Sequence, residues 1–284
     1  MGKSWACSEG YRKASGTLLL FTDADTKHSS NAISLAVAHL LSAGLDALTA
    51  GPRILCFDFW TRIVLPVIST FLHTQFSALR ANDPSNKFGY FFGSFFIIKR
   101  ETYDAVGTHE AVRHEIIEDG ALGAMVKQSG HKMKVVRGDH LIDAVWARDA
   151  STLWNAIKRT MVPVYRQSRS AAMGITAATT FLFFMPLLLL AYSALHTASG
   201  YAGVDSSILL WASLAALLLV YTVGIIECRA MQVGIRYAVL IPLGGLVMTL
   251  GFLSGLIHAK SDTAVSWRNR DYAMKDRFRS PAAT

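Results

Sequence analysis

The sequence has 284 residues, of which 52% are hydrophobic, and its mean hydropathy of +0.32 is high for a purely soluble protein. Its three cysteines, Cys7, Cys56 and Cys228, form no CxxC pair and no zinc-ligand spacing, and their odd number excludes a disulfide framework, so we expect reduced structural thiols. The net charge of +8 gathers beside apolar segments rather than on a face with interleaved aromatic residues, which argues against a nucleic-acid partner.

The first predicted element is a buried strand that ends in two acidic residues. Within GTLLLFTDADTKH, residues 16–28, the apolar run Leu18–Phe21 stops at Asp23 and Asp25. Ligands of open α/β sheets bind beyond the carboxyl ends of strands, where these carboxylates would lie. Mg²⁺ binds one or two carboxylates and completes its shell with substrate phosphates and water, so a divalent-cation site is one interpretation. The alternative is an acidic turn before a helix capped by Asn31.

Strand-like and helix-like patterns alternate through the rest of residues 1–150. A helix from Asn31 to about Ser42 is amphipathic, and its predicted inner face consists of Ile33, Val37, Leu40 and Leu41. The later patterns predict a strand at 45–54, a strand at 87–100, a short helix ended by Gly107, a helix ending near Gly130 and a strand at 132–138. Strands that alternate with helices argue for a mostly parallel sheet, so the predicted fold class is α/β.

Residues 57–79 form a long apolar helix pattern with no charged residue between Arg62 and Arg80. Its stripe includes Phe59, Ile63, Val67 and Phe71. A helix lying in a membrane interface and a helix of the protein core both have this pattern, and the two alternatives remain open.

A second acidic pair, Glu118–Asp119, stands at the predicted start of the helix that ends near Gly130. Asp119 would share a face with Leu122 and Val126, while Gly120 and Gly123 would permit close approach of another segment. The helix dipole favours a carboxylate in the first turn, so we expect Asp119 to be ionised and able to accept a proton. The alternative is an ordinary acidic pair at a helix N-terminus.

The last third of the chain carries three apolar segments, at 174–195, 206–226 and 237–257. Each is close to the roughly 20 residues that a membrane-spanning helix needs. Positive residues flank them: Lys158, Arg159, Arg166 and Arg169 before the first, and Arg229 and Arg236 between the second and third. The loop at 196–207 has no Lys or Arg, so the positive-inside rule predicts an integral membrane protein with residues 1–150 in the cytoplasm.

The C-terminal tail conflicts with this topology. Three spans would place the tail outside, but its positive residues, among them Lys260, Arg268 and Lys275, favour the inside. Either one segment is re-entrant or the tail breaks the rule.

Several motif blocks, in their order along nearly the whole chain, carry a resemblance to a known family. Residues 2–28 are similar to a block G-K-x-W-A…G…D-A-D-x-x-H, and residues 89–136 are similar to an acceptor-side block that contains R-x-x-Y-x-x-V-G and an E-D pair. VSWRNRDY, residues 265–272, is similar to W-K-G-R-x-Y, with Asn269 in place of the glycine. The chain thus resembles family-2 glycosyltransferases of the GT-A fold, in particular a membrane-anchored, lipid-modifying group of bacteria and archaea.

The resemblance implies a donor site on the first block. Asp25 would bind Mg²⁺ or Mn²⁺ directly, and Asp23 would assist at the ribose or the metal shell. Lys3 would offer a positive charge to the nucleotide's diphosphate. His28 lies where some relatives carry a residue close to the metal or the diphosphate.

The second block implies an acceptor site. Asp119 would be the catalytic base and Glu118 would shape the acceptor site. The implied architecture is a partial GT-A-like catalytic domain with a mostly parallel sheet at 1–150, followed by a basic interfacial segment at 151–172. About three transmembrane helices at 173–258 and a basic tail at 259–284 complete it.

The implied function is an inverting, metal-dependent transfer of a sugar from a nucleotide diphosphate-sugar, of the UDP or GDP type, to a lipid hydroxyl at the membrane bilayer. Two alternatives are a processive polysaccharide synthase and a non-catalytic membrane-anchored binding protein with a degenerate GT-A fold. The Q-x-x-R-W motif of processive synthases has no clean copy here, and the nearest stretch, at 154–169, offers Trp154, Lys158 and Arg159.

Relatives also have residues before the point that matches Met1–Lys3. They place there a first strand with a P-x-R-N-E-like segment, a second strand whose acidic motif holds the nucleotide's base, and often a membrane helix. We therefore expect that this chain lacks the front of its catalytic domain, either through a truncated gene model or because a short protein needs a partner chain.

Overall fold

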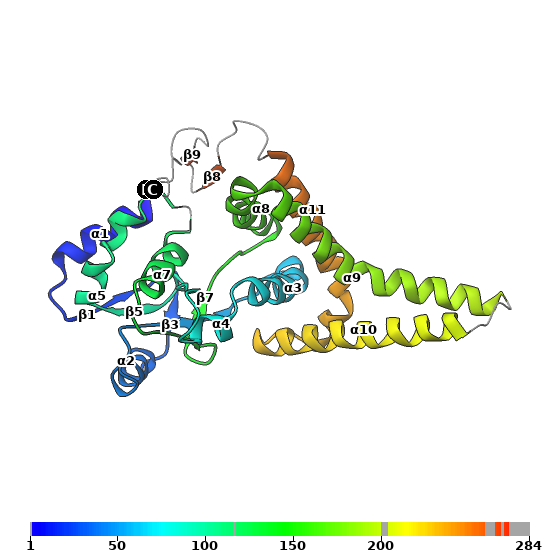
Figure 1. Ribbon diagram of the computed structural model, residues 1–284, viewed down its shortest axis with the longest axis horizontal. Coiled ribbons are helices and arrows are strands. Elements are labelled where there is room, and N and C mark those ends of the chain that lie inside the picture. The colour runs from blue at the N-terminus through cyan, green and yellow to red at the C-terminus, as the bar shows by residue number, and fades with distance from the viewer. Residues whose placement is uncertain (1, 116, 200–203, 259–264, 268–269, 273–284) are drawn as a thin grey trace. The chain divides into compact units, whose positions relative to one another are not determined.

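A computed structural model describes residues 2–115, 117–199, 204–258, 265–267 and 270–272 (Figure 1). The chain forms two compact units. Among the described residues, an α/β unit contains residues 2–55 and 72–145, and a helical unit contains residues 56–71 and 146–272. Each unit is described by itself below.

The α/β unit is built on a four-stranded sheet in the order β1-β5-β3-β6 (Figure 1). Its strands are β1 (Leu18–Phe21), β5 (Phe96–Lys99), β3 (Ala47–Gly51) and β6 (Met133–Arg137). β5 runs antiparallel to both of its neighbours, and only β3 and β6 are parallel. The predicted α/β class is therefore confirmed, but the predicted mostly parallel sheet is wrong because the sheet is mixed.

The connection between β3 and β5 explains the difference. The long helix in that connection, α3 (Phe59–Gln75), has residues 59–71 in the helical unit, so it is not the crossover helix of a β-α-β repeat. The predicted strand at 87–100 is also shorter, because only Phe96–Lys99 pairs with other strands. A strand that returns without a packed crossover is free to pair antiparallel.

A second, three-stranded sheet has the order β2-β7-β4, with β2 (Lys27–His28), β7 (Ile142–Ala144) and β4 (Arg53–Ile54). It is mixed as well, since β2 is antiparallel and β4 parallel to β7. Arg53 and Asp143 fasten β4 to β7 through two charged hydrogen bonds of 2.6 and 2.8 Å. This sheet holds the end of the acidic turn that follows β1.

The core lies on both faces of the larger sheet. Successive residues of β5 point to opposite faces: Phe96 and Ile98 join one buried cluster, and Ile97 joins the other, together with Phe95 just before the strand. The first cluster also contains Leu122 and Val126 of α7 (Glu118–Gln128), as the predicted helix face requires. β5 is thus a central strand with no polar face.

Smaller helices complete the α/β unit: α1 (Gly2–Lys13), α2 (Ala32–Ser42), α4 (Ala78–Asn82), α5 (Arg100–Ala105) and α6 (Thr108–Ala111). Gly107 and Gly130, with φ of +83° and +81°, follow α5 and α7, where they were predicted to end helices. The inner face predicted for α2 is partly wrong: Leu40 is fully buried, but Ile33 and Leu41 are 45% and 61% exposed. The buried face of α2 is therefore narrower than the face that its apolar residues predict.

The outer edge of β6 is covered by one side chain. The Asn82 amide group donates to the Val135 carbonyl oxygen at 2.9 Å and accepts from the Val135 N–H at 2.8 Å. Asn82 ends α4, so that helix is fastened to the sheet.

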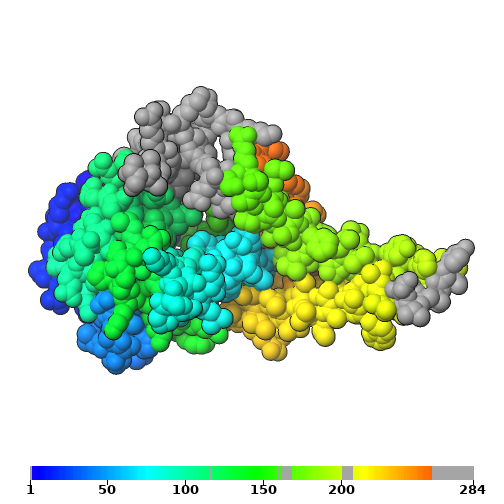
Figure 2. All heavy atoms as spheres, viewed as in Figure 1, coloured from blue at the N-terminus to red at the C-terminus, as the bar shows by residue number. Residues whose placement is uncertain are grey.

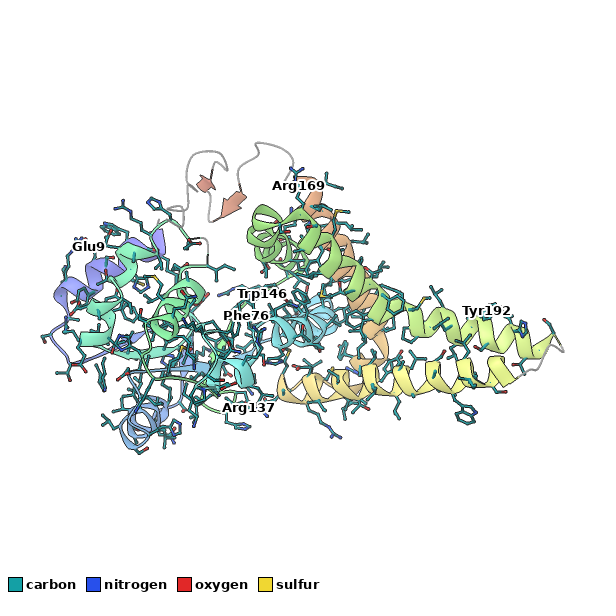
Figure 3. The ribbon with its side chains drawn as sticks, in the orientation of Figure 1. Glu9, Phe76, Arg137, Trp146, Arg169 and Tyr192 are labelled. Carbon is teal, nitrogen blue, oxygen red and sulfur yellow. The ribbon has the colours of Figure 1, made fainter. Side chains whose placement is uncertain are left out.

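The helical unit contains α8 (Ala150–Gln167), α9 (Arg169–Ala198), α10 (Val204–Ala230), the 3₁₀ helix η1 (Ile235–Leu240) and α11 (Ile241–His258), besides most of α3. α9 and α10, yellow-green and yellow, lie side by side (Figure 2). Arg169 begins α9, and Tyr192 lies toward its other end (Figure 3). Three segments, Arg169–Ala198, Ser207–Ala230 and Ile235–Ile257, are long and apolar enough to cross a membrane, which confirms that prediction.

α3 packs against α11 with one face, as predicted for a core helix. A side chain at Gly244 would come within 2.3 Å of the Ile63 carbonyl oxygen, so glycine is required for this contact. Further along both helices, the rings of Phe71 and Phe252 are 5.0 Å apart. Phe59, in the first turn of α3, remains 45% exposed.

The tail is described only in part. β8 (Val265–Trp267) and β9 (Arg270–Tyr272) pair antiparallel. The other positions of the predicted basic tail, Lys260, Arg268, Asn269 and Lys275 among them, lie outside the described residues, so the side of the membrane on which the tail lies stays an open prediction. The cysteines form no disulfide, as expected.

Candidate active site

Lys3 joins the two acidic motifs of the α/β unit. Its Nζ atom lies 2.9 Å from Asp23 Oδ1, 3.0 Å from Glu118 Oε1 and 3.8 Å from Asp119 Oδ2. Three elements meet here: α1 provides the ammonium group, the turn after β1 provides Asp23, and the first turn of α7 provides the other two carboxylates. We call these four side chains the Lys3 cluster.

The local structure explains how Asp23 reaches this position. β1 ends at Phe21, and the chain then turns, with the Thr26 N–H donating to the Asp23 carbonyl oxygen at 3.2 Å. The Thr22 hydroxyl donates to the Ser94 carbonyl oxygen at 2.9 Å, which fixes the turn against the segment before β5. The Asp23 carboxylate is thereby held at the end of a central sheet, as the strand pattern predicted.

Two glycines, Gly93 and Gly123, leave the space that the Lys3 cluster and its neighbouring segment occupy. A Cβ atom at Gly93 would lie 2.1 Å from Asp119 Oδ2 and 2.5 Å from Lys3 Nζ. A Cβ atom at Gly123 would lie 2.3 Å from the Tyr90 backbone carbon, so this glycine lets the segment at 90–93 lie against α7, as predicted. Gly120 meets only Ile117 of its own helix region, at 3.2 Å. We did not identify Gly93 from the sequence. Its only distinguishing feature there is its position among the aromatic residues of the predicted strand at 87–100.

Three carboxylates face one ammonium in the cluster, which leaves two negative charges uncompensated when all are ionised. Burial raises the pKa of Asp119 to about 6, the Glu118 charge adds to the rise, and Lys3 opposes it. The Asp119 Oδ1 atom also accepts a hydrogen bond from the Gly120 N–H at 2.8 Å. Burial thus outweighs the helix dipole, and with a pKa of about 6 Asp119 is mostly ionised at pH 7 and able to accept a proton.

Lys3 itself remains charged. Burial would lower the pKa of Lys3, but the charges of Asp119, Glu118 and Asp23 together raise it above its ordinary value. An ammonium that keeps its proton can hold two acidic motifs in place.

The structure places the remaining predicted donor residues on the same turn. Asp25 is exposed, and within the described part of the chain no ion pair or hydrogen bond engages its carboxylate. His28 Nε2 lies 3.2 Å from the Thr22 hydroxyl oxygen, and its ring meets Phe95 edge-on at 5.3 Å. His28 thus contacts both the turn after β1 and the residue before β5, and its predicted place near the metal stays a prediction.

The residues fit a cation that also binds a substrate. No group of three or more His, Cys, Asp or Glu side chains able to hold a metal is found where the structure is described. Asp23 and Asp25 offer carboxylate oxygens two positions apart, which suits a Mg²⁺ or Mn²⁺ ion whose shell is completed by phosphates and water. The negative charge left over in the Lys3 cluster favours a cation nearby.

An aromatic layer underlies the cluster. Phe21 stacks on Phe96 at 4.8 Å and lies 4.9 Å from the His109 ring. The Tyr103 hydroxyl lies 2.5 Å from His109 Nδ1 and accepts a hydrogen bond from the His109 backbone N–H at 3.0 Å. Burial, followed by the charge of Lys3, lowers the pKa of His109 to about 4. His109, which sequence reasoning missed, is therefore a neutral support beneath a charged cluster.

Comparison with known proteins adds the family. Residues 2–279 match the family model described as Glycosyl transferase family 21. No curated protein matches the chain.

Proposed function

The chain belongs to glycosyl transferase family 21 and is a glycosyltransferase, and from this premise we propose that it moves a sugar, with inversion, from a nucleotide diphosphate-sugar to a lipid hydroxyl. The family-2 assignment is corrected to family 21, while the predicted enzyme class is confirmed. One observation carries the proposal: Lys3 brings Asp23, the donor-side acid, into contact with the acidic pair that begins α7.

The turn after β1 would bind the donor. Asp25 is exposed and would hold Mg²⁺ or Mn²⁺, with Asp23 assisting at the metal shell or the ribose. A bound cation would act as a Lewis acid that neutralises charge on the departing diphosphate of a UDP- or GDP-type donor. Lys3, already within reach of Asp23, would add a positive charge on the same side.

Asp119 would act as the general base. As the acceptor oxygen forms its bond to the anomeric carbon, the bond to the diphosphate oxygen breaks, and the hydroxyl proton passes to Asp119. A base with a pKa of about 6 is mostly ionised at pH 7 and still accepts a proton readily. General-base help of this kind contributes about 10²- to 10⁴-fold in rate. Glu118 would shape the acceptor side, with Lys3 as its counter-charge at 3.0 Å.

The membrane-length helices support a lipid acceptor. Three such segments lie in the same chain as the Lys3 cluster. The positive residues that flank them, and the absence of Lys and Arg from residues 196–207, support a cytoplasmic α/β unit.

Two variants separate the proposed roles. Asp25→Ala should weaken nucleotide binding in the presence of Mg²⁺ or Mn²⁺, and Asp119→Asn should keep nucleotide binding and lose transfer. Calorimetric titration with the nucleotide measures binding, and a transfer assay on lipid extract measures activity. Chelation of the metal should weaken nucleotide binding of the unaltered chain, as Asp25→Ala does. Glu101→Gln, an exposed acid on α5, is the matched control.

Equal loss of nucleotide binding in both variants would overturn the division of roles. A long polymer as product would indicate a processive synthase instead. Nucleotide binding with neither transfer nor hydrolysis by the unaltered chain would indicate a binding protein.

A further inference from the structure

Two positive side chains of the helical unit converge on one tyrosine. Arg62, in α3, donates from Nη1 to the Tyr237 hydroxyl at 3.3 Å, and its guanidinium carbon lies 5.8 Å from the centre of that ring. Arg236, the neighbour of Tyr237 in η1, places its guanidinium carbon 5.4 Å from the same centre. We call Arg62, Arg236 and Tyr237 the Tyr237 cluster.

Neither arginine of the Tyr237 cluster forms an ion pair with a carboxylate in the described part of the chain. Within the described residues, neither guanidinium group lies within 4.0 Å of an Asp or Glu oxygen. The acid closest in sequence, Asp58, accepts hydrogen bonds from the Thr61 N–H at 2.8 Å and the Thr61 hydroxyl at 2.7 Å, and it acts on Arg62 only through its more distant charge. Arg236 is exposed and Arg62 partly exposed, so both can still donate hydrogen bonds to an anion.

The cluster is preformed rather than dependent on an anion. Gly244 of α11 lets the Ile63 backbone approach closely, and the rings of Phe71 and Phe252 meet at 5.0 Å. These contacts fix α3 on α11 next to Arg62. The two arginines, from elements far apart in the sequence, therefore stand together without a ligand to gather them.

The position of the cluster points to a membrane surface. η1 begins at Ile235, where the third membrane-length segment, Ile235–Ile257, also begins. The centre of the Phe59 ring lies 6.4 Å from that of Tyr237, and the ring centres of Phe59 and Trp60 are 5.4 Å apart. Both aromatic side chains are partly exposed, at 45% and 39%. Aromatic residues with this exposure are typical of the level at which lipid headgroups meet the hydrocarbon.

We propose that the Tyr237 cluster binds the phosphate of an anionic phospholipid headgroup. Guanidinium groups match phosphate oxygens with paired N–H donors, and among the described residues neither of the two here has a carboxylate oxygen within 4.0 Å. Phe59 and Trp60 would contact the glycerol and the first methylene groups of the same lipid. A free phosphate would gain nothing from these rings, so a lipid fits the site better. The site shares no residue with the Lys3 cluster, and the proposal does not depend on the proposed reaction.

Binding to the full chain in a neutral detergent tests the proposal. Native mass spectrometry would count bound phosphatidylglycerol and phosphatidylcholine, and melting curves would be recorded with each lipid and with inorganic phosphate. The unaltered chain should prefer phosphatidylglycerol. The double variant Arg62→Gln with Arg236→Gln should bind it about 30-fold more weakly, because each basic residue near an anionic membrane surface contributes about 1 kcal/mol of attraction.

Controls keep the result specific. Lys13→Gln with Lys87→Gln removes two exposed positive charges from the α/β unit and should leave the preference unchanged. Arg236→Gln alone alters only an exposed side chain, so it covers the case in which the double variant fails to fold. It should weaken binding by about fivefold. Equal binding by the variants and the unaltered chain would overturn the proposal. An equal stabilisation by inorganic phosphate would overturn the lipid assignment.

Discussion

The two units leave opposite charges uncompensated. In the α/β unit, the single ammonium of Lys3 faces three carboxylates. In the helical unit, two guanidinium groups surround the Tyr237 ring, and the described residues place no carboxylate within 4.0 Å of them. A leftover charge is costly where it is buried, as Glu118 is, whereas the exposed Arg236 is solvated. The cation proposed for the first site and the phosphate proposed for the second would each bring the opposite charge.

The largest effect is expected at the glycine that borders the Lys3 cluster. Gly93→Ala would place a methyl group 2.1 Å from Asp119 Oδ2, so the base and Lys3 would have to move apart. We expect kcat/KM for transfer to fall by at least about 100-fold, as for loss of a positioned base. Gly10→Ala, on α1 with open space around it, should leave kcat/KM unchanged. Retained activity in Gly93→Ala would mean that the cluster is not the active site.

The pH dependence of transfer should follow Asp119. This base works when ionised, and its pKa of about 6 means that protonation inactivates it as the pH falls. We expect kcat/KM to be constant above about pH 7 and to fall by about tenfold per pH unit below pH 6. A profile measured at saturating metal checks this. An acid limb near pH 4 would show that burial does not control this carboxylate.

Lys3→Met should shift that profile. The Lys3 charge lowers the pKa of Asp119, so its removal should raise that pKa and move the acid limb to higher pH. At pH 7 we expect about a tenfold loss of kcat/KM, with partial recovery at pH 8. Lys3→Arg keeps the charge and should keep the limb in place. Lys13→Met, at the exposed end of α1, is the control, and an unshifted limb in Lys3→Met would contradict the coupling.

The smallest effect concerns stability through His109. Its pKa is lowered from 6.5 to about 4, so the folded state resists protonation while the unfolded chain accepts it. Above pH 6.5, His109 is neutral in both states and its burial costs no stability. As the pH falls from 6.5 toward 4, the free energy of unfolding of the α/β unit decreases by on the order of 3 kcal/mol. Melting curves of His109→Asn should show a weaker pH dependence over this window. His140→Gln, an exposed histidine, should behave as the unaltered chain does.

Patterns among neighbouring residues predicted much of the fold. The strand at Leu18–Phe21, the helix starting at Glu118 and the ends at Gly107 and Gly130 all follow from apolar spacing and glycine geometry. The membrane-length helices followed from length and composition alone. These features depend on residues close together in the chain.

Features that depend on distant residues were not predicted. The direction of β5 could not be read from its sequence, because a central strand is apolar on both faces whether its neighbours are parallel or antiparallel. The contacts of Lys3 with Glu118 and Asp119, and the role of Gly93, arise only when the folded chain brings α1 and α7 together. Each acidic motif could be identified from the sequence, but the role of Lys3 as the positive charge that both motifs share could not.

The Asn82 side chain has a consequence for how copies of this protein can associate. By donating to and accepting from Val135, it takes the place that a residue of an additional strand would occupy. A second molecule approaching this edge would find the backbone groups of Val135, in the middle of β6, already satisfied, which hinders strand addition at that point. Asn82 thus acts as a built-in guard against aggregation, supplied by a short helix rather than by a charge or a proline.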